Sequence, residues 1–377
     1  MSYLGNIENF DAAATTPCDE RILKKIIPFF TDQFTNVDSS NGKSRKLRSL
    51  INQSAEKIAG TSSLQCLPEE VVFTSGGTEA NNTIILGFPY NEKTIAVSAT
   101  EHQSILKPAA KIPGNVIIPV LENGQIDIVA LEDSLKTEQI RLVSVHAVNN
   151  ETGAIQPISA IYKLCKQYGA FLHTDASQYW GKEKNLLDAD YVTISGHKVH
   201  APKGIGSLII KSGSPEISPL LLGGGHQKGR RAGTLPTPLV VGMGMSTDYF
   251  KESYGFCEKI KNIRDNMIDD LKMYGNVVMN TDSSCQALFF NFSLTDIPAS
   301  DVIAHMEKQH GIIISRGSAC MEGKESHVIA GMKGKTTENA CNSIRISWSK
   351  FNKTCNFTSL PHMIENSIVE MKKESFI

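Results

Sequence analysis

The chain has 377 residues, of which 41% are hydrophobic and 20% charged, and its formal net charge is −1. A chain of this length can bury about two or three domain-sized cores. The balanced charge steers the protein neither to nucleic acid nor to a membrane surface, so we expect neither as a direct partner. No apolar run approaches the roughly 18 residues that a membrane-spanning helix needs.

Two features of the sequence favour a reducing compartment. Residues 1–8 lack both the basic region and the apolar core of a secretory signal. The eight cysteines are scattered and form no C-x-x-C pair. This pattern argues against a zinc site and against a disulfide framework. We therefore expect a cytoplasmic protein without a bound metal.

The first elements of the chain are expected to be short. Asp19 can cap a helix that runs to about Phe30. Residues 35–46 are polar and contain a glycine, which predicts a loop. Apolar side chains then recur at helical spacing over residues 46–59, which predicts an amphipathic helix.

A glycine-rich turn, Ser75–Asn82, follows the predicted strand 71–74 and leads into a predicted helix over residues 80–86. Such a turn presents free backbone N–H groups and the positive end of the helix dipole. It therefore suits an anion, and most usefully a phosphate. A plain strand-to-helix junction also needs glycines, so the turn alone leaves both interpretations open.

Short apolar runs then alternate with helical patterns. A helix is expected at 157–168, and strands are expected at 94–97, 116–120, 140–145, 170–175, 191–194 and 207–210. This alternation predicts an α/β fold with a mostly parallel sheet that is covered by helices on both faces.

Polar side chains gather where these predicted strands end. Sheets of this kind bind ligands outside the C-terminal ends of their strands. Each polar residue alone also fits a turn, a cap or a loop, but at one edge of a sheet they would form a site with phosphate-binding groups, an acid and an amine. The residues are Thr78, His102, Asn150, Asp175, Gln178, Ser195, His197 and Lys198.

Lys198 has the least ordinary position among them. The segment Thr193–Gly206 begins in an apolar run, delivers Ser195, His197 and Lys198 into a loop, and turns back into a second apolar run. Most lysines are solvated surface charges. A lysine at the mouth of a buried strand therefore indicates a specific partner for its amine.

The pattern changes in the second half of the chain. Residues 223–236 are glycine-rich and basic, which is typical of a mobile or interface loop, and residues 238–271 are largely helical. A small α+β domain is then expected, with a helix at 300–310 and strands at 287–292, 312–315 and 343–347.

Two residues of this second half are candidates for a functional role. Arg345 lies inside the apolar strand, where an unpaired charge would be costly, so it needs a carboxylate from the protein or from a ligand. Cys320 follows a strand in a segment rich in glycine, serine and charge, close to Arg316. A nearby positive charge favours the thiolate, which is the reactive form. Cys320 is therefore a candidate nucleophile.

Taken together, these residues resemble the cysteine desulfurases, a branch of the class V aminotransferase family of fold-type I enzymes that use pyridoxal 5′-phosphate (PLP). The resemblance covers nearly the whole chain, from Asp11–Pro17 to Ser343–Ser347. Seven motifs carry it in order: Thr74–Asn82, Thr100–His102, Val148–Gly153, His173–Gln178, Ser195–Lys198, Arg231–Pro236 and Gly317–Cys320.

The resemblance implies two domains. The large PLP-binding domain would span residues 12–255 around a mostly parallel seven-stranded sheet. Residues 1–11 and 256–377 would form the small α+β domain, which carries Arg345 and the catalytic-cysteine loop at about residues 315–326.

The resemblance also implies roles at the cofactor. Lys198 would bind PLP covalently as a Schiff base, which needs a neutral amine. His102 would stack on the pyridine ring and assist proton transfer. Asp175 would pair with the pyridinium nitrogen and so keep the ring a good electron sink. Gln178 would donate a hydrogen bond to the phenolic oxygen.

The remaining implied roles concern the phosphate and the substrate. Thr234 would reach the phosphate from the other subunit of a homodimer. Asn150 would contact the cofactor and, with Arg345, orient the carboxylate of L-cysteine. Cys320 would take the sulfur as a persulfide, release L-alanine and pass the sulfur to an acceptor protein. The phosphate would be held by Gly77, Thr78, Ser195 and His197.

The sequence departs from the family pattern in several places. Arg316 stands where a second serine is usual, Met321 where a small polar residue is usual, and Trp348 where leucine is usual. The chain also ends at Ile377, without the longer tail that docks an iron–sulfur scaffold in housekeeping desulfurases. Transfer of sulfur to tRNA or DNA thio-modification and transfer to iron–sulfur cluster assembly therefore both stay open. Selenocysteine lyase and class V aminotransferase activities are the alternative functions.

Overall fold

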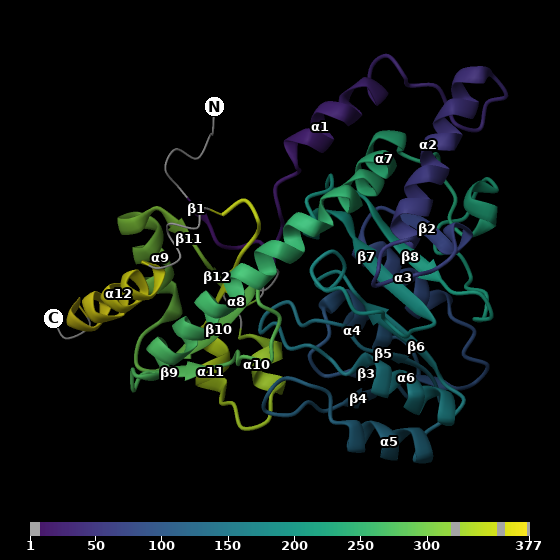
Figure 1. The fold of residues 1–377 in the computed structure, drawn as a ribbon. Helices are drawn as coiled ribbons and strands as arrows, with labels where there is room; N and C mark the ends of the chain where they lie inside the picture. Colours follow the sequence, from purple (N-terminus) through teal and green to yellow (C-terminus); the bar gives the residue numbers. More distant parts are fainter. Residues whose placement is uncertain (1–7, 318–324, 353–358, 375–377) are drawn as a thin grey trace.

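A seven-stranded sheet and a four-stranded sheet organise the computed structural model, which describes residues 8–317, 325–352 and 359–374 (Figure 1). In the larger sheet only β8 runs antiparallel to its neighbours, which confirms the predicted mostly parallel sheet. The strands lie in the order β2 (Val71–Thr74), β8 (Gly206–Ile210), β7 (Tyr191–Ser195), β6 (Phe171–Asp175), β5 (Ile140–Ser144), β3 (Thr94–Ser98) and β4 (Val116–Ile118).

Helices cover both faces of this sheet, as the alternation of elements predicts. On β3, Ile95 and Val97 pack into a core cluster with α3 and α4, whereas Ala96 between them packs into the main core on the other face. Side chains alternate in this way because successive residues of a strand point to opposite faces. The helices are α1 (Glu20–Ile26), α2 (Gly42–Ala59), α3 (Gly77–Gly87), α4 (Gln103–Ala109), α5 (Ile128–Thr137), α6 (Ile158–Gln167) and α7 (Thr237–Ser246).

Side-chain caps set the first helix boundaries. The Asp19 carboxylate accepts a hydrogen bond from the Arg21 N–H, which confirms the predicted cap of α1. The predicted loop over 35–46 is wrong at its end, since α2 already begins at Gly42. The cause is Asn41, whose side chain accepts a hydrogen bond from the Ser44 N–H and so starts the helix one turn earlier.

The smaller sheet is antiparallel and has the order β12 (Ser315–Arg316), β13 (Ser343–Ser347), β10 (Phe289–Leu294) and β9 (Val277–Met279). A two-stranded parallel pair joins β1 (Glu8–Asn9) to β11 (Ile312–Ile313). The helices of this lobe are α9 (Ala299–His310), α10 (His327–Gly331), α11 (Thr337–Cys341) and α12 (Leu360–Glu374).

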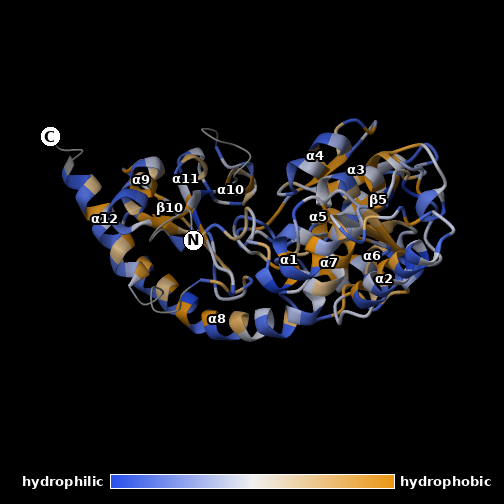
Figure 2. Cartoon of the chain, turned by 90° about the horizontal axis from the view of Figure 1, so that it is seen from above, coloured by the Kyte–Doolittle hydropathy of each residue, from blue (hydrophilic) through white to orange (hydrophobic). Residues whose placement is uncertain are grey.

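A long helix, α8 (Phe250–Lys272), runs from the larger lobe to the smaller one (Figure 2). The domain boundary predicted after residue 255 falls inside this helix, and the division into 12–255 and 256–377 stays a prediction. Short 3-10 turns complete the described chain: η1 (Ile27–Phe29), η2 (Pro68–Glu70), η3 (Gly196–Lys198), η4 (His226–Gly229) and η5 (Thr247–Tyr249).

Two of the family departures have structural partners. Arg316 donates a hydrogen bond from Nη2 to the carbonyl oxygen of Cys341, at 2.7 Å. Trp348 is 1% exposed and packs near Phe290, with 6.4 Å between ring centroids. No helix among the described residues combines the length and the apolar character that crossing a membrane requires.

One glycine fixes a turn of the larger lobe against the smaller sheet. Gly153 has φ +77°, and a Cβ there would lie 2.6 Å from the Cβ of Phe289 in β10. Gly169 has a similar φ, +70°, but no atom lies within 4 Å of its Cβ position. Both glycines therefore have a positive φ, but only Gly153 has another residue close to its Cβ position.

We expect Gly169→Ala to lower the free energy of unfolding by about 1 kcal/mol, the cost of left-handed backbone. Gly153→Ala should cost about 1–3 kcal/mol more, because the added methyl group meets Phe289. Urea unfolding of both variants measures the difference. Equal losses would contradict the close packing of the two lobes at this turn.

Candidate active site

One cavity at the C-terminal edge of the larger sheet brings the predicted strand-end residues together. It encloses about 290 Å³. Arg345 reaches it from β13 of the smaller sheet, while the other predicted residues come from the larger lobe. The predicted site residues that line it are Gly77, Thr78, His102, Asn150, Asp175, Gln178, Ser195, His197, Lys198 and Arg345.

Two predicted site residues are not among the lining residues. Thr234 is exposed and lies outside this cavity, so its role across a dimer interface stays a prediction. Cys320, like Met321, lies outside the residues that the structure describes.

The start of α3 forms an anion cradle. Gly77 is the first residue of this helix, and Gly76 before it has φ +155°. A Cβ on Gly77 would lie 3.1 Å from Ser177 Oγ and 3.5 Å from Ser195 Cβ, so a side chain would crowd the cradle. The first N–H groups of a helix have no partner within it, and the helix dipole is positive there. The place suits a phosphate.

His197 stands next to this cradle as a neutral ring. Its Nδ1 lies 3.0 Å from Thr15 Oγ1. Burial, and then the nearby charge of Lys198, lower the pKa of His197 from 6.5 to about 4. A neutral imidazole holds an anion through its N–H group rather than through a full charge.

Asp175 ends β6 and is fixed by two donors. Its Oδ1 accepts a hydrogen bond from the Ser177 N–H at 2.9 Å, and its Oδ2 accepts one from Asn81 Nδ2 at 2.7 Å. Asn81 Nδ2 also lies 2.9 Å from Ser104 Oγ, which in turn lies 2.7 Å from Nδ1 of His102. One hydrogen-bonded chain therefore sets the positions of both the acid and the histidine.

Asn81 and Ser104 also line the cavity, although the sequence predicts no site role for either residue. A signal for Asn81 is present, because it follows Gly77 by four residues and so lies on the same face of α3. Ser104 gives no such signal, since its contact with Asn81 joins two different helices.

The hydrogen bonds of His102 indicate which of its ring nitrogens carries the proton. As the N-cap of α4, its Nδ1 accepts a hydrogen bond from the Ser104 N–H at 3.1 Å. Burial lowers the pKa of His102. The neutral ring therefore carries its proton on Nε2, which is the tautomer this acceptor role requires.

Lys198 and Gln178 share a backbone acceptor. The Lys198 amine donates to the carbonyl oxygens of Ala13 and Ala14, the second at 2.7 Å. Gln178 Nε2 donates to the same Ala13 oxygen at 2.9 Å. The N-terminal segment thus forms one wall of the site.

Arg345 has a carboxylate partner within the protein. Its Nη2 lies 2.7 Å from Asp11 Oδ1, and its Nη1 donates to the Asn150 carbonyl oxygen at 2.9 Å. The side chain is buried, and its Nε has no hydrogen-bond partner among the described residues. The sequence allows a carboxylate partner either from the protein or from a ligand, and in the structure the protein supplies one through Asp11. Binding of a substrate carboxylate stays a prediction.

A second histidine, also missed in the sequence, lines the cavity. His146 Nδ1 lies 2.8 Å from Oε1 of the fully buried Glu101, which also accepts hydrogen bonds from Ser98 Oγ and the His146 N–H. Glu101 thereby fixes the ring of His146 at the cavity wall.

This set of groups fits PLP. The cradle at Gly77 suits its phosphate, the Lys198 amine its aldehyde, the Asp175 carboxylate its ring nitrogen and the Gln178 amide its phenolic oxygen. The described residues contain no group of three or more His, Cys, Asp or Glu side chains that could hold a metal ion.

Comparison with known proteins agrees with this fit. The sequence profile described as Aminotransferase class-V matches residues 8–356. The chain belongs to this family. Within the family it groups with the cysteine desulfurases, and the predictions of an enzyme of this group and of PLP as its cofactor are confirmed.

Three relatives define that grouping. Cysteine desulfurase IscS of Rickettsia felis is 33% identical over 362 residues, covering 90% of this chain and 86% of the relative. The X-ray structure of a NifS-like protein from Rickettsia africae superposes with a TM-score of 0.86 at 30% identity, covering 96% of this chain and 99% of the other. The structure titled SspA in complex with cysteine superposes with a TM-score of 0.78 at 29% sequence identity, covering 92% of this chain and all of the other.

The low pKa of His197 predicts a loss of stability in acid. In the unfolded chain a histidine takes up a proton below pH 6.5, whereas folded His197 stays neutral down to about pH 4. Its contribution to stability is therefore complete above pH 6.5 and is lost as the pH falls from 6.5 to about 4.

We expect His197→Gln to flatten the fall in the free energy of unfolding over this pH range, measured on the apoprotein by urea unfolding. His362→Gln is the matched control, because the His362 side chain is 81% exposed. An unchanged pH dependence in His197→Gln would contradict the neutral buried ring.

Proposed function

We propose that this enzyme removes the sulfur of L-cysteine, releases L-alanine and holds the sulfur as a persulfide on Cys320. The observation that carries the proposal is that one cavity holds a lysine amine, a fixed aspartate and a buried arginine, namely Lys198, Asp175 and Arg345. Similarity to cysteine desulfurase IscS and to SspA in complex with cysteine supports the choice of substrate.

The protein's own groups supply binding and orientation. When bound, PLP supplies an electron sink for negative charge at the carbon beside the substrate amine. Gly77, Ser195 and His197 hold the phosphate. The Asp175 carboxylate, fixed by Asn81, favours a protonated ring nitrogen and so strengthens the sink.

Substrate recognition falls to Arg345 and Asn150. The Arg345 guanidinium already pairs with Asp11, and it lines the cavity, where its positive charge can also attract the substrate carboxylate. The Lys198 amine is placed to carry the proton that leaves the α-carbon. His102, neutral with its proton on Nε2, assists that transfer.

Cys320 completes the reaction. Its thiolate attacks the sulfur of the substrate, so that a sulfur–sulfur bond forms and the carbon–sulfur bond breaks. The electron pair stays with the carbon, which gains a proton and becomes the methyl group of alanine. This role rests on the motif Gly317–Cys320 and on family similarity.

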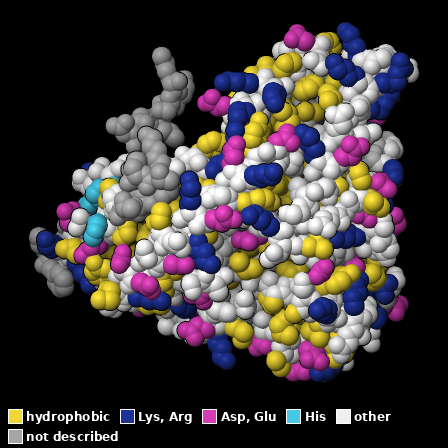
Figure 3. Space-filling model, viewed as in Figure 1, with side chains coloured by type: hydrophobic (Ala, Val, Ile, Leu, Met, Phe, Trp, Pro, Cys, Tyr) yellow, Lys and Arg dark blue, Asp and Glu magenta, His cyan; other side chains and the backbone are white. Residues whose placement is uncertain are grey.

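We further propose a homodimer in which Thr234 of one subunit reaches the phosphate site of the other. Hydrophobic side chains are exposed around α1 and the turn after it, and Figure 3 shows them gathered on this part of the surface. They include Leu23 (45% exposed), Ile27 (50%), Phe30 (59%) and Phe34 (74%). A contiguous apolar patch of this kind supports a protein interface.

The sulfur then passes to an acceptor protein in the cytoplasm. The six cysteines among the described residues are all free thiols, in keeping with a reducing compartment. Acceptors for thio-modification of tRNA or DNA and acceptors for iron–sulfur assembly are both compatible with a persulfide donor, and a pull-down with the persulfide-loaded enzyme distinguishes them.

The test is Cys320→Ser. With L-cysteine and a thiol reductant, sulfide release should fall at least about 100-fold, because the attacking group is gone. The absorbance band of the lysine-bound cofactor should persist in Cys320→Ser and disappear in Lys198→Ala.

Cys341→Ser is the matched control and should keep wild-type sulfide release. Wild-type sulfide release by Cys320→Ser would refute the persulfide mechanism. Release of selenide from selenocysteine without sulfide release from cysteine would assign a selenocysteine lyase, and amino-group transfer would assign an aminotransferase.

A further inference from the structure

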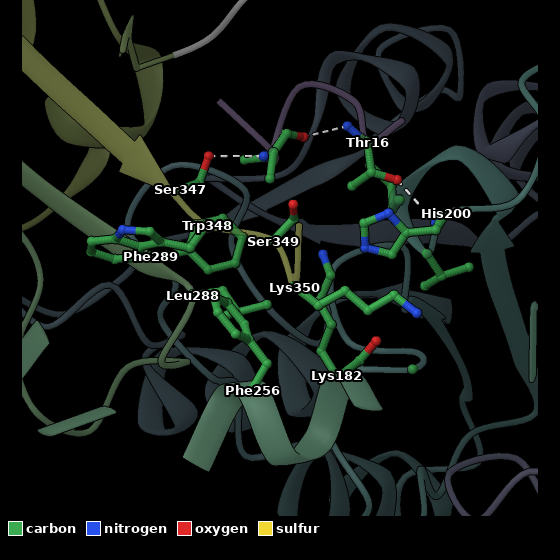
Figure 4. Close-up of a pocket in the computed structure, with 16 residues that line it drawn as sticks. Thr16, Lys182, His200, Phe256, Leu288, Phe289, Ser347, Trp348, Ser349 and Lys350 are labelled. Carbon is green, nitrogen blue, oxygen red and sulfur yellow. Dashed lines mark hydrogen bonds between the residues drawn. The ribbon is translucent and has the colours of Figure 1, made fainter. Parts of the chain in front are cut away.

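Lys182 is a buried lysine to which the proposed reaction gives no role. It is 8% exposed and lines a small cavity beside the active site, which it shares with Lys198, Phe256 and Phe289 (Figure 4). Lysine is seldom buried in this way, because removing an ammonium group from water is costly. A buried lysine therefore needs a specific partner.

That partner is Gln178. The Lys182 amine donates a hydrogen bond to Gln178 Oε1. The ring centroid of Phe289 lies 5.8 Å from the same amine. Among the described residues no carboxylate forms an ion pair with Lys182, so the amide oxygen is its main polar contact.

The chain is shaped to make this contact. Residues 176–182 form a tight turn after β6, in which the Trp180 N–H donates to Ala176 O and the Lys182 N–H donates to Tyr179 O. Gly181 has φ +74°, and a Cβ there would lie 2.7 Å from the ring of Phe250. The glycine thus lets the turn pack closely against Phe250 immediately before Lys182.

The contact fixes the orientation of an amide. An amide has a donor end and an acceptor end, whereas a protonated lysine amine only donates and the Ala13 carbonyl oxygen only accepts. With Oε1 toward Lys182, the Nε2 group of Gln178 faces Ala13 O, at 2.9 Å, and the cofactor cavity. Nε2 carries two hydrogens, so one remains for a ligand.

We propose that Lys182 is a positioning residue, whose amine holds the Gln178 amide with its N–H group toward the phenolic oxygen of PLP. The inference rests on the proposed role of Gln178 and deepens it. Lys182 also lines the same small cavity as Lys198. Burial, and then the nearby Lys198, lower the pKa of Lys182 to about 7.

The test is a double-mutant cycle in the full-length protein. Dissociation constants of PLP are measured by titrating the apoprotein, and the absorbance band of the bound cofactor is followed against pH. Lys182→Met should weaken PLP binding about fivefold to tenfold and shift the pH titration of the band, because the amide loses its fixed orientation. Gln178→Ala should have a similar effect.

The combination of the two substitutions should weaken binding no more than Gln178→Ala alone, because Lys182 acts through Gln178. Lys184→Met is the matched control, since the Lys184 side chain is 58% exposed in the same turn region. It should leave both measurements at the wild-type value.

Lys182→Gln covers the case in which Lys182→Met fails to fold. It keeps a donor for Gln178 Oε1 without the charge, so PLP affinity within about twofold of wild type is expected. A tenfold loss in Lys182→Gln would overturn the proposal. So would full additivity of Lys182→Met with Gln178→Ala.

The outcomes separate this inference from the proposed function. A wild-type protein without a cofactor band would overturn both. A wild-type protein that binds PLP, together with a Lys182→Met variant that matches it in affinity and in pH titration, would overturn the positioning role alone.

Discussion

The ion pair between Asp11 and Arg345 fixes the N-terminal segment against β13 of the smaller sheet, beside the active-site cavity. The contact is 2.7 Å long and the Arg345 side chain is only 2% exposed, so loss of Asp11 would leave a buried charge without its partner, at a cost of about 3–5 kcal/mol. The same N-terminal segment continues to Ala13, whose carbonyl oxygen accepts hydrogen bonds from Lys198 and Gln178. Under the proposed function, recognition of a substrate by Arg345 would therefore be coupled to Lys198 and Gln178 through this segment.

The larger sheet determines which residues share the cavity. Because most of its strands are parallel, their C-terminal ends meet at one edge, and the residues that follow them share one cavity. Burial then changes the pKa values of the histidines among these residues. The pKa values of His102 and His197 both fall, chiefly because the rings are buried, so both rings stay neutral. A site with fewer positive charges binds an anion mainly through oriented N–H groups.

Much of this arrangement is local and therefore visible in the sequence. The strand at Val71–Thr74 has its predicted bounds, and the eight residues that the strand-end rule predicts all line one cavity. What the sequence does not reveal are contacts that depend on packing between distant elements. The bond from Asn81 to Asp175 spans 94 positions in sequence, and no local pattern marks it. Lys182 is four residues from Gln178, but only burial distinguishes it from a surface lysine.

We propose different tasks for two neighbouring lysines, in which Lys198 binds the cofactor and Lys182 positions Gln178. Borohydride reduction of the PLP-loaded enzyme, followed by peptide mapping with mass spectrometry, tests it most directly. We expect a pyridoxyl group on Lys198 and an unmodified Lys182. A pyridoxyl group on Lys182, or on neither lysine, would contradict it.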